Sequence, residues 1–180
     1  MKNEWLTGEI LSLYCGRHGK YVEAEIFFPE KQRESSRSTE VYEAQREKAL
    51  GGAWDRLMTC ARVGGNHWVY LVAFRGLQQR VQLYDSGSLF GSHAEAQQRV
   101  EAMAECLAEF TGTRWEAEVR PGVPQQENAD DCGVFCTMFA EFATTPDAAL
   151  PFSQKDARAQ RKKIAQELTG AEVDEARFLS

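Results

Sequence analysis

Residues 56–74 read RLMTCARVGGNHWVYLVAF, two largely apolar runs separated by a pair of glycines. Apolar runs of this length, bounded by turn residues, are typical of β-strands. We therefore predict strands over Arg56–Val63 and His67–Phe74, joined by a turn at Gly64–Gly65. The second run is apolar at every position after His67, a pattern typical of a central strand that is buried on both faces. This hairpin is expected to form the middle of a β-sheet.

The flanking segments supply further strands and the helices. Alternating apolar residues predict a strand or extended segment over Tyr21–Phe28 and strands over Arg80–Tyr84 and Trp115–Val119. Helical spacing of apolar residues predicts helices over 4–14, about 38–50, 94–110, from 131 or 132 to 142, and 154–168. Together these elements predict an α+β fold, a mostly antiparallel central sheet flanked by helices.

Length and charge restrict the classes of protein that fit. A chain of 180 residues is expected to form a single domain over 1–180. The net charge of −6 argues against a general nucleic-acid binder, and the basic outer face of the last helix (Lys155, Arg158, Arg161, Lys162, Lys163) is explained by solvation. The polar residues 30–40 are expected to form an exposed loop. The first residues lack the apolar stretch of a signal peptide, and the longest apolar run is too short to span a bilayer.

Five cysteines are present, Cys15, Cys60, Cys106, Cys132 and Cys136. Because the number is odd, they cannot all pair within the chain, and a reducing intracellular compartment is the simplest interpretation. No CxxC pair or Cys/His ladder indicates zinc, so we expect no metal and no cofactor.

Two polar residues at strand ends form a candidate catalytic pair. If the turn of the second hairpin centres on Gly76, His67 and Asp85 face each other across the ladder, with Cβ atoms about 5 Å apart. Asp85 could then hold one imidazole nitrogen and leave the other free to act as a base. A chance pairing of two surface residues is the alternative, and the register of the strands decides between them.

Cys132 is the candidate nucleophile. It lies at the predicted start of a buried helix, where free N–H groups and the helix dipole stabilise a thiolate. Gly133 follows and would let a substrate backbone approach closely. The alternative is an inert buried cysteine, which suits Cys136, one helical turn further, better. Gln125 and Gln126 precede Cys132, and a glutamine amide there could donate to a developing oxyanion.

The segments GGNHWVYLV, QLYDSGS and PQQENADDCGVF together resemble the Ulp/SENP family of cysteine isopeptidases. The resemblance spans about residues 64–136 and includes the spacing of six residues from Gln126 to Cys132. It implies a papain-like or adenain-like fold with a catalytic core over about 64–142. It also implies that residues 17–60 contribute to substrate recognition.

The resemblance also assigns roles. It implies His67 as general base, Asp85 as its orienting carboxylate, Cys132 as nucleophile, and Gln126 as oxyanion donor together with the Cys132 N–H. Trp68 and Trp5 would sandwich the terminal Gly-Gly of a ubiquitin-like modifier. The implied partner is SUMO, the neddylation modifier or ubiquitin, bound by a monomeric enzyme in the cytoplasm, the nucleus or the cytosol of a host cell.

Other functions remain open at this stage. The stretch CGVFCTMFAEFA is also similar to adenovirus-type processing proteases, so the chain could be a viral-type or effector endopeptidase that acts on a polyprotein. YopJ-like acetyltransferases share a similar triad with Glu in the Asp position, which Asp85 argues against. A catalytically inactive domain that holds a modifier is the non-enzymatic alternative.

Overall fold

The computed structural model describes residues 6–28, 39–76, 79–87 and 93–170. Within these ranges five strands form one sheet in the order β1–β2–β3–β4–β5. The strands are β1 (Lys20–Tyr21), β2 (Arg56–Val63), β3 (His67–Phe74), β4 (Arg80–Tyr84) and β5 (Glu116–Val119). The central strands β2, β3 and β4 are antiparallel, whereas β1 and β5 pair in parallel with β2 and β4. The α+β class is confirmed, and the sheet is mixed because its two edge strands are parallel to their neighbours.

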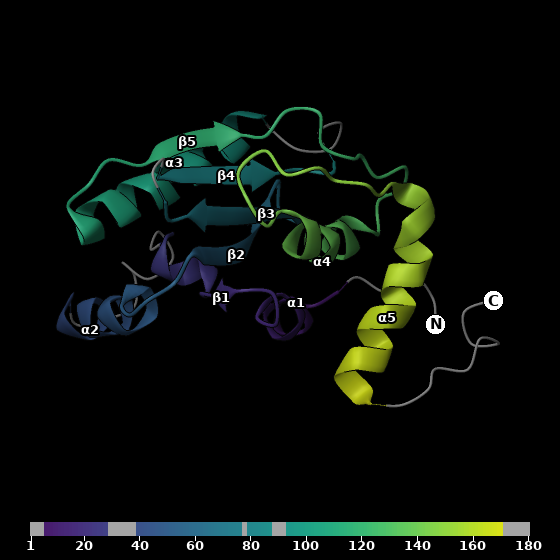
Figure 1. Cartoon of the computed structure of the whole chain (residues 1–180), viewed down its shortest axis with the longest axis horizontal. Coiled ribbons are helices and arrows are strands. Elements are labelled where there is room, and N and C mark those ends of the chain that lie inside the picture. The colour runs from purple at the N-terminus through teal and green to yellow at the C-terminus, as the bar shows by residue number, and fades with distance from the viewer. Residues whose placement is uncertain (1–5, 29–38, 77–78, 88–92, 171–180) are drawn as a thin grey trace.

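Helices cover both faces of this sheet (Figure 1). They are α1 (Gly8–Cys15), α2 (Thr39–Leu50), α3 (His93–Thr111), α4 (Cys132–Phe142) and α5 (Ala157–Thr169), with short 3-10 turns η1 (Ala24–Ile26) and η3 (Gln154–Asp156). One apolar core joins α1 and α4 to the sheet, and the other joins α3 to the opposite face. In Figure 1, α2 and α5 stand at opposite ends of the molecule.

Strand β3 belongs to both cores, as the sequence predicts for a central strand. All eight of its residues are buried. Tyr70 and Val72 pack in the core with α4, whereas Val69 and Leu71 pack in the core with α3. Because successive side chains of a strand point to opposite faces, this packing fixes the rotation of β3 about its axis. The same packing therefore fixes the direction in which the His67 side chain points at the start of β3.

The prediction of an extended segment over Tyr21–Phe28 is wrong for most of its length. The strand ends at Tyr21, and the chain then forms the 3-10 turn η1. A hydrogen bond of 2.9 Å from the Val22 N–H to the Met58 carbonyl joins the chain to β2 one residue beyond the strand. The turn brings Phe27 into the core beside Val22, which an extended chain at the edge of the sheet would not do. Most of the predicted loop, 30–38, lies outside the described residues.

Two further findings concern the described part of the chain. No helix in it combines the length and the apolar character that crossing a membrane requires. Within the same ranges, no group of three or more His, Cys, Asp or Glu side chains is placed to hold a metal ion.

Candidate active site

His67 and Asp85 meet at one end of the sheet. His67 is the first residue of β3, and Asp85 directly follows β4. The His67 Nε2 atom lies 2.6 Å from Asp85 Oδ1, and both side chains are about one-tenth exposed. With Nε2 engaged, Nδ1 is the ring nitrogen left for another partner.

The register that would place these two residues directly opposite each other is wrong. The ladder pairs Tyr70 with Tyr84. Continued past the strand end, it puts Asp85 across from Val69 rather than from His67. The carboxylate instead reaches His67 diagonally, since residues two apart along a strand share a face.

Gly87 occupies the position that faces His67, although it is not among the site residues predicted from the sequence. A Cβ atom on Gly87 would lie 2.5 Å from His67 Cε1, so only glycine leaves room for the imidazole. The Gly87 N–H also donates to Asp85 Oδ1 over 2.8 Å. The sequence signal that could have indicated this close approach is the glycine two residues after Asp85.

Cys132 is the first residue of α4 and is almost completely buried. Burial raises the pKa of its thiol, but a hydrogen bond with His67, the Trp68 and Gly133 N–H groups and the His67 charge outweigh burial and lower that pKa below its ordinary value. Burial lowers the pKa of His67, but hydrogen bonds with Asp85 and Cys132, and their charges, raise it to about 9. These opposite changes favour a thiolate paired with an imidazolium.

The other four cysteines have the opposite character. Hydrogen bonding to Cys60 and burial raise the pKa of Cys15, and hydrogen bonding to Cys136 and burial raise that of Cys60. Burial raises the pKa of Cys106 and of Cys136. All five thiols are free. Cys132 is therefore the one cysteine whose surroundings favour reaction at neutral pH.

Gln126 is buried in the loop that leads to α4. Its Oε1 accepts a hydrogen bond from Ser86 Oγ over 2.8 Å, and its Nε2 donates to the Asn128 carbonyl over 2.5 Å. The neighbouring Gln125 faces elsewhere, because its Nε2 donates to the backbone carbonyls of Asp85 and Val123. Of the two glutamines considered in the sequence, Gln126 is thus the buried one.

The predicted substrate-binding residues lie around the start of α4, as far as they are described. Trp68 is buried beside Gly8, and the Arg62 guanidinium stacks 4.7 Å from the centre of its indole ring. Gly133 is buried against Leu6, since a Cβ atom there would lie 3.0 Å from Leu6 Cβ. Leu6 thus lies where a side chain on residue 133 would stand, and the approach of a substrate backbone to Gly133 stays a prediction. Trp5 lies outside the described residues.

A buried ion pair holds Asp131, the residue before Cys132. The Asp131 carboxylate accepts hydrogen bonds from Arg161 of α5 (2.6 and 2.9 Å), from Gln154 (2.7 Å) and from Asn128 (2.8 Å). Burial raises the pKa of Asp131, but these partners outweigh it and hold the pKa below its ordinary value. The expectation that Arg161 is simply solvated is therefore wrong, and its role could not be seen locally because Asp131 lies 30 residues away.

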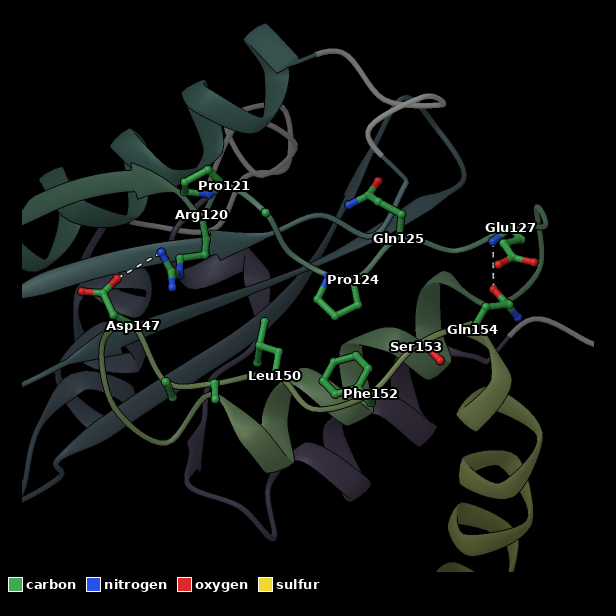
Figure 2. Close-up of a pocket in the computed structure, with 13 residues that line it drawn as sticks. Arg120, Pro121, Pro124, Gln125, Glu127, Asp147, Leu150, Phe152, Ser153 and Gln154 are labelled. Carbon is green, nitrogen blue, oxygen red and sulfur yellow. Dashed lines mark hydrogen bonds and ion pairs between the residues drawn. The ribbon is translucent and has the colours of Figure 1, made fainter.

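A pocket of about 380 Å³ lies next to this loop (Figure 2), and neither His67 nor Asp85 is among its lining residues. Its walls come from segments 120–127 and 147–154, with Pro124, Leu150 and Phe152 among the apolar lining residues. Ion pairing of Arg120 with Asp147 closes one end, and the Glu127 N–H donates to Gln154 Oε1 at the other (Figure 2).

Comparisons with known proteins give the family and the fold of the chain. A family model described as the Ulp1 protease family, C-terminal catalytic domain, matches residues 30–173. A Sentrin-specific protease of Caenorhabditis elegans is 28% identical over 120 residues, which are 61% of this chain and 16% of that protein. The chain thus spans less than a fifth of the length of this relative.

Two solved structures share the fold. The C-terminal Ulp1 protease domain in complex with Smt3, the yeast ortholog of SUMO, has a TM-score of 0.70 at 20% identity, covering 94% of this chain and 78% of that one. The Xanthomonas campestris effector XopD bound to ubiquitin has a TM-score of 0.55 at 15% identity, covering 97% and 88%.

The solved structures show the fold of the Ulp1 protease domain, and the family model gives the class of the chain as that of a protease catalytic domain. Since the family model matches most of the chain, this protein belongs to the Ulp1 protease family.

Proposed function

We propose that this chain cleaves after the C-terminal Gly-Gly of a ubiquitin-like modifier, with Cys132, His67 and Asp85 as its catalytic triad. The observation that carries the proposal is the buried pair of His67 and Asp85, 2.6 Å apart, next to a cysteine whose pKa is lowered by His67. Packing alone does not require these three groups at one site.

The geometry supports the following sequence of steps. The Cys132 thiolate attacks the carbonyl carbon of the terminal glycine, and His67, held through Nε2 by Asp85, carries the proton on Nδ1. That proton passes to the leaving amine, and a thioester forms on Cys132. His67 then takes a proton from water, which attacks the thioester and releases the glycine carboxylate.

The negative charge on the carbonyl oxygen needs donors in each addition step. We assign this role to the backbone N–H of Cys132 at the start of α4 and to the Gln126 side-chain amide. One of the two Nε2 protons of Gln126 is bound by the Asn128 carbonyl, and the other remains for the oxyanion.

SUMO is the first modifier to test, because the Caenorhabditis elegans relative is a Sentrin-specific protease and the Ulp1 domain was solved with Smt3. Ubiquitin comes next because XopD was solved bound to it, and the neddylation modifier completes the set. Trp68, beside Gly8, and Leu6, over Gly133, would narrow the slot for residues without a Cβ. We assign modifier recognition to the region 17–60, and the activity to a reducing compartment, since Cys132 must stay reduced.

The test is hydrolysis of fluorogenic C-terminal amides of SUMO, the neddylation modifier and ubiquitin. We expect turnover of at least one, abolished in Cys132→Ala and retained in Cys136→Ala. Cleavage of short peptides without a folded modifier would instead favour the processing endopeptidase. Binding of a modifier without any cleavage would favour an inactive binding domain.

A further inference from the structure

Ser86 is a buried hydroxyl beside the proposed catalytic residues, and none of the steps above uses it. It directly follows Asp85 and is about 1% exposed. We propose that Ser86 is a positioning residue that fixes the orientation of the Gln126 carboxamide, so that an N–H rather than the amide oxygen faces the oxyanion. This inference rests on the proposed function of Gln126.

Ser86 holds Gln126 at two points. The Gln126 backbone N–H donates to the Ser86 carbonyl over 2.8 Å, and the Ser86 hydroxyl lies 2.8 Å from Gln126 Oε1. The first bond fixes the loop against the end of β4, and the second fixes the end of the side chain. Any residue at position 86 would supply the first bond through its backbone carbonyl, but the second bond needs the serine hydroxyl.

The two partners of the amide together exclude the flipped orientation. The Asn128 carbonyl accepts hydrogen bonds and cannot donate them, so the amide nitrogen must face it. The Ser86 hydroxyl must then be the donor to Oε1. A flipped amide would place two carbonyl oxygens together and would present Oε1 to the developing negative charge. Without the hydroxyl, Asn128 alone holds the orientation.

Ser86 acts on a different side chain from its neighbours Asp85 and Gly87. Asp85 and Gly87 act on His67, through the 2.6 Å contact and through the close approach to the imidazole. Ser86 contacts Gln126 instead. Its loss should therefore slow the addition steps and leave the thiolate of Cys132 unchanged.

A double-mutant cycle tests this with the modifier substrate that the wild type hydrolyses. Ser86→Ala should lower kcat about tenfold with KM unchanged, as expected for one buried neutral hydrogen bond. Gln126→Ala should lower kcat about 100-fold. In the Gln126→Ala background, adding Ser86→Ala should change kcat by less than about twofold. Ser12→Ala is the control, because that hydroxyl donates within α1 to the Glu9 carbonyl.

Two results of the cycle would overturn the proposal. One is a further tenfold loss in the Gln126→Ala background. The other is a change in the pH midpoint for alkylation of Cys132 in Ser86→Ala. Either result would mean that Ser86 supports the fold of the site in general.

A substrate-free measurement keeps the two proposals distinct. The side-chain amide resonances of Gln126, assigned by their loss in Gln126→Glu, should differ from those of solvated glutamines. In Ser86→Ala they should move toward the solvated values, with proton exchange at least about tenfold faster. Unchanged resonances would refute the role of Ser86. If they move but the wild type hydrolyses no modifier, the proposed function fails while the orienting role of Ser86 stands.

Discussion

Replacing Asp85 by Asn removes one charge from the site and nearly preserves its shape. The rise of the His67 pKa from 6.5 to about 9 corresponds to about 3 kcal/mol in favour of the imidazolium. Burial lowers the pKa of His67, so this rise is what remains after the effect of burial has been subtracted. The hydrogen bond and charge of Asp85 each raise it more than those of Cys132. A hydrogen bond to a charged group contributes about 2 kcal/mol, so removing the Asp85 charge predicts a loss of about 30-fold in kcat/KM at neutral pH.

The sign of the pH dependence follows from the two pKa values. The thiolate–imidazolium pair exists above the lowered pKa of Cys132 and is lost as the pH rises through the His67 value of about 9. In Asp85→Asn, burial of the imidazole dominates, so the pKa of His67 falls. Cys132 then loses its neighbouring cation, and its pKa rises.

The assay is the rate of iodoacetamide alkylation as a function of pH, with the modified cysteine identified by peptide mass spectrometry. The wild type should be alkylated at Cys132 with a midpoint below the ordinary thiol value, and Asp85→Asn should shift that midpoint upward. An unchanged midpoint, with kcat/KM within about threefold of the wild type, would refute the reasoning.

Three further predictions concern residues around the proposed triad. Gly87→Ala should reduce kcat/KM at least tenfold, because its Cβ would meet the His67 ring at 2.5 Å, and unchanged kinetics would contradict this. Arg161→Gln should lower the free energy of unfolding in urea by about 3 kcal/mol, since it removes the charge partner of buried Asp131. Arg17→Gln, which breaks the exposed pair of Arg17 with Glu167, is the control and should lower the free energy of unfolding by under about 1 kcal/mol. Equal losses of stability in the two variants would refute the distinction between the buried and the exposed pair. The pKa of Asp131 is lowered, so its stabilisation is full above its ordinary pKa and lost as the pH falls through the lowered value. The Arg161→Gln penalty, measured by urea unfolding, should accordingly shrink in acid.

The central strands could be predicted from sequence because local signals agree there. The bounds of β2, β3 and β4 coincide with those predicted, since the apolar runs of β2 and β3 and the alternating pattern of β4 end at turn residues. The first turn contains Gly64 and Gly65, both with positive φ, which glycine adopts without strain. The segment after Tyr21 was mispredicted because its alternation suits a strand, whereas burial of Phe27 depends on distant partners.

The candidate site was predictable in its residues but not in all of its geometry. The register of the β3–β4 hairpin depends on the turn centre, which composition does not determine, and His67 reaches Asp85 because diagonal neighbours share a face. The partnership of Asp131 with Arg161 joins two helices that pack only in the folded chain. No local pattern in the sequence distinguishes Arg161 from the solvated basic residues beside it.

The most direct test of the central claim is covalent labelling by modifiers that carry a C-terminal electrophile. After reaction with SUMO, neddylation-modifier and ubiquitin probes, peptide mapping should find the adduct on Cys132 alone. Cys132→Ala should abolish labelling, and Cys136→Ala, a matched change one helical turn away, should leave it intact. An adduct on Cys136 or Cys60, or no adduct from any probe on the folded protein, would contradict the account.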